Sequence, residues 1–379
     1  MITQTEQMSY RLSILNTQQQ KLTYQTSTQE KLQEGSDDSM LYSRLILVDE
    51  KVRTYEGLKS QIQKTQVQNN MADSSMSEVK KILENIKEQL VKANTSTTTN
   101  DGLTAIASSI AGLKENLFQL ANTQVENEYV FAGSNSSIKP FEKDASGKIT
   151  YLGNSQLRKV AIEEGSYRER GITGFDMMTY ASSTAYRDED FTFKETDRII
   201  DQDGNEWKLN SPANTLTKYD LNGNATTETI TPVTNDALTP PTYSARLPDV
   251  AGTKFEAKTN IFDLIDATTN ALKKVDSNGD PISAEDSRTL VAKYQGEVDK
   301  AYDSVNIAHA NLGGKNKIFE ISLERVSSKL TQFDILSRNL GSADLAQVAI
   351  ESKALELTYT ALYSTISKTN ELSLVNFLK

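Results

Sequence analysis

Apolar residues recur at heptad spacing toward both ends of the chain, and this pattern predicts long helices there. Successive positions lie three, four or seven residues apart, which gathers the side chains on one narrow stripe of a helix. The N-terminal stripes are Met8, Leu12, Leu15 and Leu22; Leu41, Leu45, Val48, Val52, Tyr55 and Ile62; and Leu103, Ile106, Ile110, Leu113, Leu117 and Leu120. The C-terminal stripes are Phe319, Leu323, Val326, Leu330, Phe333 and Leu340, then Val348, Leu355, Tyr359, Leu362 and Ile366. Because such stripes are too narrow for a wide core, each helix needs one or two partner helices.

Polar residues interrupt these stripes at Gln19, Lys59 and Ser352. A polar residue in an apolar seam weakens a coiled coil that stands alone. We therefore expect residues 1–40 and 341–379 to be marginal in isolation, disordered or helical, and to fold on assembly. Ordering a segment at binding costs conformational entropy, but it permits large wrapped interfaces.

The middle of the chain, from about residue 129 to about residue 250, has short β-prone runs separated by turn residues. Examples are residues 148–151, 159–162 and 191–193. All seven prolines of the chain lie between Pro140 and Pro281, and proline breaks helix interiors. The sequence therefore predicts a β-rich segment inserted between two helical ends.

Turn residues mark where these strands reverse. Asp203-Gly204 and Asn222-Gly223 are typical of tight hairpins, and residues 144–147 are typical of a longer turn. Residues 211–248 are rich in Thr, Asn and Pro, and we expect them to be mostly loop.

Helical character resumes near Ile261, breaks at a turn over residues 276–281, and resumes near Ser283. The Gly313-Gly314 pair predicts the end of that last helix after Leu312. The predicted fold is mainly α with a β-rich insertion: long antiparallel N- and C-terminal coiled-coil helices form a rod, and the middle β domain forms a knob. The expected divisions are an N-terminal arm at 1–40, the two parts of the helical rod at 41–128 and 259–340, the β-rich middle domain at 129–258 and a C-terminal arm at 341–379.

Composition and charge exclude several classes of partner. The 379 residues carry a formal net charge of −10, which argues against nucleic acid and against an anionic membrane surface. The chain has no cysteine, so disulfides and thiolate metal sites are impossible. The N-terminal residues show no secretory signal, and no stretch approaches the roughly 18 apolar residues of a membrane helix.

Candidate catalytic chemistry is weak throughout. His309 is the sole histidine and lies in a predicted helix without a nucleophile motif, and a His-Glu-x-x-His zinc motif needs two histidines. Asp276, Asn278 and Asp280 resemble the start of a calcium loop, but the glycine that such a loop needs at its sixth position is Pro281 here. No phosphate-binding Gly-rich motif is found. We therefore expect no enzyme, no catalytic residues, no cofactor and no metal. The single tryptophan, Trp207, is more simply a core anchor than a sugar-stacking residue.

Two sets of residues, one near each end of the chain, resemble known sequences. Residues 31–39, Lys-Leu-Gln-Glu-Gly-Ser-Asp-Asp-Ser, are similar to the Leu-x-x-Gly loop and Asp-Asp pair of the flagellin superfamily, with a shortened spacing between Gly35 and the Asp37-Asp38 pair. Residues 310–316 and 339–346 are similar to its C-terminal Leu-Gly-Ala-x-x-Asn and Asp-Ala-Asp-Leu-Ala segments. The ending Ser-Leu-Val-Asn-Phe-Leu at residues 373–378 looks more like the junction subunit than the filament flagellin.

A third set of residues separates the relatives. Residues 129–134, Tyr-Val-Phe-Ala-Gly-Ser, are followed by Lys-Pro-Phe at 139–141, Tyr-Leu-Gly-Asn at 151–154 and Val-Ala-Ile at 160–162. This run resembles the entry into the middle domain of hook-associated protein 3, and filament flagellins typically lack it. The entry residues are Phe131, Gly133, Pro140, Phe141, Tyr151 and Gly153.

The resemblance implies a structural junction subunit that links the flagellar hook assembly to the flagellin filament. Its implied partners are the first hook-associated junction protein, flagellin, copies of itself in a ring, an export chaperone and the flagellar type III export apparatus, and its implied location is the extracellular flagellum. The expected assembly interface is Met8, Leu12, Leu15, Leu22, Leu355, Tyr359, Leu362, Ile366, Leu372, Leu374, Phe377 and Leu378. The expected hinges and turns are Gly35, Asp37, Asp38, Gly313 and Gly314. A filament flagellin and a secreted adhesin with a coiled-coil stalk remain alternatives.

Overall fold

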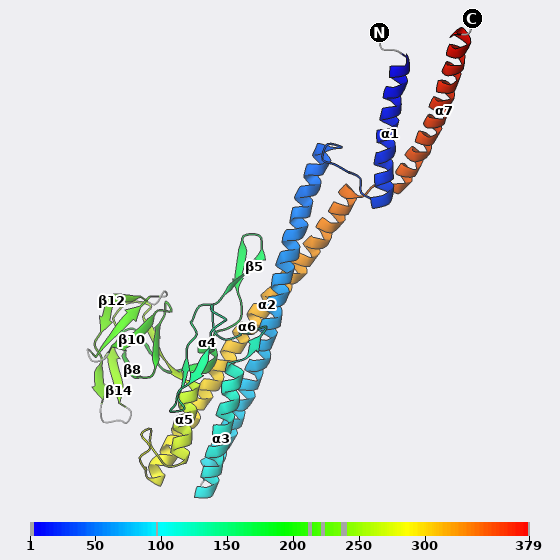
Figure 1. Ribbon diagram of the computed structural model, residues 1–379. Coiled ribbons are helices and arrows are strands. Elements are labelled where there is room, and N and C mark those ends of the chain that lie inside the picture. The colour runs from blue at the N-terminus through cyan, green and yellow to red at the C-terminus, as the bar shows by residue number, and fades with distance from the viewer. Residues whose placement is uncertain (1–3, 96–97, 211–213, 221–223, 236–240, 378–379) are drawn as a thin grey trace. The chain divides into compact units, whose positions relative to one another are not determined.

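The computed structural model describes residues 4–95, 98–210, 214–220, 224–235 and 241–377, without the side chains of residues 4, 5 and 369–377. The chain forms two compact units. The first contains Met1–Ser60 and Leu323–Lys379, and the second contains Gln61–Ser322. Figure 1 shows the helices and strands of both.

Heptad spacing continues along α2, which runs over Ser39–Ala93, and explains how it packs in the second unit. Its buried residues there alternate at three and four residues: Ala72, Met76, Val79, Leu83, Ile86, Leu90 and Ala93. Such spacing keeps one stripe facing a partner helix along the whole length. The partner stripe lies on α6, Ala284–Gly341, as Val298, Ala301, Val305, Ala308 and Leu312.

Hydrogen bonds beside this stripe give the direction of the pairing. Lys80 Nζ donates to Asn306 Oδ1 at 2.9 Å, and Tyr302 OH donates to Glu84 Oε1 at 2.6 Å. Residue numbers rise on α2 as they fall on α6, so the two helices are antiparallel.

Two further helices complete the helical core of the second unit. Thr99 caps α3, Asn100–Ala121, by accepting a hydrogen bond from Gly102 N, and Asn260 caps α5, Ile261–Leu272, by accepting one from Phe262 N. Both helices bury apolar residues in the same core as α2 and α6. Phe262 of α5 packs edge-on against Phe118 of α3, with ring centroids 6.4 Å apart.

Fifteen strands and one short helix, α4 at Gly174–Met178, are described between α3 and α5. The strands are β1 Gln124–Val125, β2 Glu128–Tyr129, β3 Phe141–Lys143, β4 Ile149–Tyr151, β5 Lys159–Glu163, β6 Ser166–Glu169, β7 Thr179–Tyr186, β8 Asp190–Lys194, β9 Arg198–Asp201, β10 Glu206–Asn210, β11 Thr215–Tyr219, β12 Ala225–Ile230, β13 Val233–Asn235, β14 Thr242–Arg246 and β15 Lys254–Asn260. The first six form three antiparallel hairpins: β1–β2, β3–β4 and β5–β6.

The remaining strands form two antiparallel sheets around a separate core. One sheet has the order β12-β11-β10-β9-β15-β7, and the other has the order β13-β14-β8. Alternate residues point inward, as at Phe191 and Phe193 of β8. Trp207 packs 5.0 Å from Phe255 between ring centroids, and its indole nitrogen donates to Asp201 Oδ2 at 3.1 Å. The interpretation of Trp207 as a core anchor is therefore confirmed.

In the first unit, α1 at Gln4–Thr28 lies beside α7 at Leu345–Phe377, near both ends of the chain (Figure 1). Leu22, Val348 and Leu355 form a small buried cluster between these helices. In the same unit, Tyr55 of α2 packs against Phe333 of α6 with ring centroids 5.4 Å apart. The predicted fold class is confirmed: long N- and C-terminal helices flank a β-rich middle segment.

Two sequence predictions are wrong. The helix expected to stop at Gly313-Gly314 continues unbroken to Gly341, because the flanking stripe residues Leu312 and Phe319 are both fully buried and hold it in place. The segment over residues 211–248, expected to be mostly loop, contributes β11, β12, β13 and β14. Its threonines are β-branched and suit strands, a preference that outweighs the turn residues between them. The Asn222-Gly223 turn lies outside the described residues.

The helical Gly314 makes a testable prediction. A Cβ at this position meets nothing within 4 Å, so Gly314→Ala removes the entropic cost of glycine without a clash. We expect the free energy of unfolding to rise by about 1 kcal/mol, measured by urea titration of the purified chain. Gly133→Ala is the control. Gly133 has φ of +82°, so that substitution is expected to destabilise, and a loss of stability in Gly314→Ala would contradict the helical assignment.

Candidate assembly surfaces

The paired helices α1 and α7 enclose a groove in the first unit. It has a volume of about 500 Å³, and Met8, Leu15 and Leu362 line it with other residues of both helices. Tyr359 OH donates across the pair to Asn16 Oδ1 at 2.6 Å, and burial raises the pKa of Tyr359. The contact between α1 and α7 therefore buries few side chains. The fully buried ones are Leu22, Val348 and Leu355, near the end of α1 and the start of α7.

Among the described side chains on the helices of this unit, twelve large apolar ones are exposed to solvent. Its exposed apolar side chains are between 41% and 70% accessible: Tyr10, Ile14, Met40, Tyr42, Ile46, Leu47, Ile335, Leu336, Leu345, Ile350, Leu357 and Tyr363. Single exposed apolar residues are ordinary, but a dense set along paired helices is typical of a protein–protein interface.

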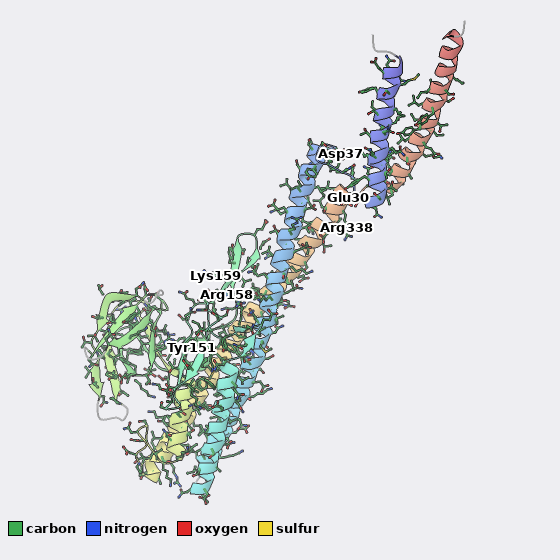
Figure 2. All side chains as sticks on the ribbon, in the orientation of Figure 1. Glu30, Asp37, Tyr151, Arg158, Lys159 and Arg338 are labelled. Carbon is green, nitrogen blue, oxygen red and sulfur yellow. The ribbon has the colours of Figure 1, made fainter. Side chains whose placement is uncertain are left out.

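The first joint, residues 29–38 between α1 and α2, is hydrogen bonded to the second joint, residues 342–344 between α6 and α7, and to the end of α6. Lys31 N donates to Gly341 O at 2.7 Å, and Ala343 N donates to Gln29 O at 2.9 Å. Figure 2 labels Glu30 in the first joint and Arg338 in the last turn of α6. The two joints thus form a short antiparallel bridge. This bridge holds the end of α1 beside the start of α7. The sequence motifs pointed to both segments, but nothing in them predicted that they pair.

The carboxylates of Asp37 and Asp38 accept hydrogen bonds from backbone N–H groups in and beside the first joint. Asp38 Oδ1 accepts from Leu41 N at 2.9 Å and so caps the start of α2. Asp37 Oδ2 accepts from Gln33 N at 2.9 Å and from Glu34 N at 3.2 Å. These backbone hydrogen bonds hold the pKa of Asp37 below its ordinary value.

A glycine fits the same joint for a steric reason. A Cβ on Gly35 lies 2.9 Å from the ring of Tyr42, so a larger residue requires the ring to move. At the second joint, Asp344 Oδ1 accepts from Ala346 N at 3.0 Å and caps α7. Of the predicted hinge residues, Gly35, Asp37 and Asp38 therefore lie together in a turn, whereas Gly313 and Gly314 lie inside α6.

The predicted entry residues converge in the second unit. Tyr151 OH donates to Phe131 O at 3.1 Å and to Asn154 O at 2.9 Å, and its ring packs 5.1 Å from that of Phe141. Leu152 N donates to Pro140 O at 2.8 Å. Burial raises the pKa of Tyr151 well above its ordinary value. Figure 2 labels Tyr151 beside the helices of this unit.

Glycines let the backbone segments of this entry approach closely. A Cβ on Gly133, whose φ is +82°, lies 2.5 Å from the carbonyl oxygen of Asn154. A Cβ on Gly153 lies 2.7 Å from the carbonyl oxygen of Ala132. The Phe-Ala-Gly and Tyr-x-Gly motifs thus form one packed structure, which explains why these residue types occur at these positions.

An ion-pair cluster that the sequence did not reveal lies beside the entry. Glu128 Oε2 accepts from Gln68 Nε2 at 2.6 Å and from Arg170 at 3.0 Å, and Glu128 Oε1 accepts from Arg158 at 3.3 Å. Burial opposes ionisation of Glu128, but the hydrogen bonds from Arg170 and Gln68 outweigh it and lower the pKa to about 2. The cluster ties α2 to β2 and to the segments flanking the β5–β6 hairpin.

The remaining predicted interface residues belong to the two ends of the chain. Leu362 and Ile366 are half-buried; Leu372, Leu374 and Phe377 fall in the helix without described side chains; and Leu378 lies outside the described residues. Met8, Leu12 and Leu15 of α1 are half-buried as well. The structure brings the two stripes together at Leu15, Leu22, Leu355 and Tyr359.

The described residues contain no group of three or more potential metal ligands. His309 faces Asp73, with Nε2 and Oδ1 3.0 Å apart, across the seam between α2 and α6. Among the described helices, none is both long enough and apolar enough to cross a membrane.

Comparison with known proteins agrees with the sequence motifs. Residues 2–136 match the model of the bacterial flagellin N-terminal helical region. Flagellar hook-associated protein 3 of Escherichia coli strain K12 is 27% identical over 187 residues, which cover 48% of this chain and 58% of that protein. The Salmonella typhimurium protein of the same name is 24% identical over 182 residues, 48% of this chain and 56% of that protein. The matched region thus spans little more than half the length of these curated relatives.

Solved structures share the fold. The flagellar hook-associated protein 3 of Legionella pneumophila matches 78% of this chain and 98% of its own, with a TM-score of 0.52 and 17% identity. FlgL of Xanthomonas campestris matches 76% of this chain and 98% of its own, with a TM-score of 0.52 and 14% identity. Residues 2–136 of the chain are therefore similar to the N-terminal helical region of flagellin. The resemblance to hook-associated protein 3 of the flagellin superfamily, which the sequence motifs indicated, is confirmed.

Glu128 makes a prediction about pH. Its folded pKa of about 2 lies below the ordinary 4.5, so its contribution is complete above pH 4.5 and disappears as the pH falls toward 2. We expect Glu128→Gln to lower the free energy of unfolding by about 1–2 kcal/mol at pH 7 and by less at pH 3, measured by urea titration. Glu126→Gln is the matched control, because Glu126 makes an exposed ion pair with Lys64. An equal effect of both substitutions at pH 7 would contradict the special role of Glu128.

Proposed function

We propose that this chain is a structural junction subunit, which links the flagellar hook assembly to the flagellin filament and catalyses no reaction. The proposal is supported mainly by the many exposed apolar side chains on the helices of the first unit, where α1 and α7 bury only a small cluster against each other. The names of the curated relatives support the same role.

The proposed assembly mechanism is coiled-coil packing of the two ends. The stripes at Met8, Leu12, Leu15 and Leu22 and at Leu355, Tyr359, Leu362 and Ile366 meet each other and the same stripes of neighbouring copies. The C-terminal residues Leu372, Leu374, Phe377 and Leu378 extend that interface. Many weak, repeated apolar contacts then carry mechanical load from one subunit to the next, and the open residues of the arms lose their contact with water.

The proposed partners are the first hook-associated junction protein, flagellin and copies of this chain in a ring. Before assembly, an export chaperone holds the C-terminal stripe, and the flagellar type III apparatus exports the chain to the extracellular flagellum. We further propose the fivefold division at residues 40, 128, 258 and 340, in which the two terminal arms build the junction and the middle domain lies outside it.

Two alternative functions are a filament flagellin and a secreted adhesin. A filament flagellin has the same arms, and the packed entry around Phe131, Phe141 and Tyr151 favours the junction subunit over it. A secreted adhesin with a coiled-coil stalk would bind a ligand through the middle domain. In the described part of that domain, Trp207, its most suitable stacking residue, is buried in the core.

The groove between α1 and α7 makes a testable prediction. Leu362→Asp places a charge against Met8 and Leu15, where burial in the assembly removes it from water. We expect the purified chain to keep its β-sheet core, seen by circular dichroism and near-ultraviolet signals of Trp207, while a strain carrying the variant loses motility. Ser364→Asp is the matched control, because Ser364 is exposed and does not line the groove. Normal swimming of the Leu362→Asp strain would contradict the proposed interface.

Deletion of the gene tests the function directly. We expect electron microscopy to show hooks without filaments, with unpolymerised flagellin in the medium. Intact filaments of normal number would refute the junction role and favour a redundant flagellin or an adhesin.

A further inference from the structure

The seam of α2 contains a buried amide in a position that its heptad pattern reserves for an apolar side chain. The three-four spacing that runs through Ala72 and Met76 continues backward to Asn69, Thr65 and Ile62. Asn69 is only 2% exposed. Thr65 satisfies its own hydroxyl by donating to Gln61 O at 2.9 Å. Among the described residues, Asn69 Nδ2 has no hydrogen-bond partner, so this donor is buried at a cost.

A matching acceptor lies on the facing helix. Asn316 Oδ1 of α6 is also buried and also lacks a hydrogen-bond partner among the described residues. The antiparallel register set by Lys80 with Asn306 and by Asp73 with His309 runs on toward this turn of α6. Asn69 lies 11 residues before Lys80, and Asn316 lies 10 residues after Asn306, so this pairing continues to place Asn316 opposite the turn that carries Asn69.

Contacts with a third segment support this placement. Lys315 Nζ donates to Gly171 O at 3.2 Å, and a Cβ on Gly171 lies 3.7 Å from Asn69 Oδ1. Asn69 and Lys315, the chain neighbour of Asn316, therefore approach the same residue from two helices. Burial lowers the pKa of Lys315, in keeping with a polar group held inside a seam.

The two orphaned atoms are chemically complementary, since one is a donor and the other an acceptor. We propose that Asn69 and Asn316 are joined by a buried water molecule, which accepts from Asn69 Nδ2 and donates to Asn316 Oδ1. A buried water of this kind satisfies polar groups that have no direct partner. The inference is independent of the proposed junction function.

Asn69, Asn316 and the water between them favour one register of α2 against α6. The apolar stripe of α2 from Ala72 to Ala93 repeats every seven residues, so apolar contact alone distinguishes poorly between the native pairing and a slip of one heptad. A slip of seven residues moves Asn69 away from Asn316 and leaves both amides among apolar side chains. A buried asparagine in a coiled coil fixes register by this means, at some loss of stability.

The absence of cysteine from the chain makes the register directly measurable. Full-length chains carry either Lys80→Cys with Asn306→Cys, which reports the native register, or Lys80→Cys with Gly313→Cys, which reports a slip of one heptad. A short bis-maleimide reagent then crosslinks whichever pair is close. Each pair is made with native asparagines, with Asn69→Leu, with Asn316→Leu and with both. Asn70→Leu is the matched control, because Asn70 is the exposed neighbour of Asn69.

With native asparagines, and with Asn70→Leu, we expect only the native crosslink. With both leucines we expect both crosslinks. Each single leucine should lower the melting temperature by about 2–4 °C, because it strands one amide, and the double substitution should recover that loss. Far-ultraviolet circular dichroism verifies that every variant is helical. Melting shifts that simply add, or a double variant that crosslinks only in the native register, would overturn the proposal.

The water itself has a separate test. A crystal structure of the native chain should show density between Asn69 Nδ2 and Asn316 Oδ1, within hydrogen-bond distance of both. A direct amide–amide hydrogen bond, or two amides that face away from each other, would refute the bridge.

Discussion

The antiparallel seam between α2 and α6 is the interaction on which the second unit depends. Each helix offers one narrow apolar stripe, so neither has a stable place without the other. The residues that meet are remote in sequence, since Lys80 and Asn306 are 226 positions apart. Closing so long a loop costs conformational entropy before any contact is gained. The seam therefore has to be long, and its continuous run of buried residues from Ala72 to Ala93 meets that need.

A second constraint acts where the chain passes from the helices into the strands. The packed entry around Phe131, Phe141 and Tyr151 forms this connection. The rings of Phe141 and Phe262 lie 5.5 Å apart at their centroids and join the first strands to α5. Close backbone approach at Gly133 and Gly153 keeps this connection compact, and Glu128 with Arg170 closes its polar side. A flexible linker would leave the middle domain free to turn, whereas a packed one transmits force between helix and sheet.

The helical ends, the β-rich middle and the strands β4, β5 and β8 were predictable from the sequence, because heptad spacing and short β-prone runs reflect burial directly. The failures have physical causes. Glycine at 313 and 314 favours a helix end locally, but the buried Leu312 and Phe319 on either side outweigh that preference. The strands between residues 214 and 246 resemble loop because turn residues separate their threonines, and neighbours across the sheet add to the β-preference of those threonines. The cluster at Glu128 and the bridge between Glu30 and Ser342 join residues distant in sequence, and no local pattern encodes such pairs.

The pairing of β7 with β15 has a consequence for how such chains diversify. Thr179 and Asn260, the first residue of one strand and the last of the other, are direct partners in the ladder. The chain thus leaves the helical core and returns to it at adjacent points, so a short turn is long enough to join these points when the two sheets between them are removed. The core of the two sheets shares no buried residue with the helical core. Substitutions in the aromatic core around Phe191, Trp207 and Phe255 can therefore accumulate during evolution without changing the seam, whereas Tyr180 of β7 packs in the helical core and ties the start of that strand to it.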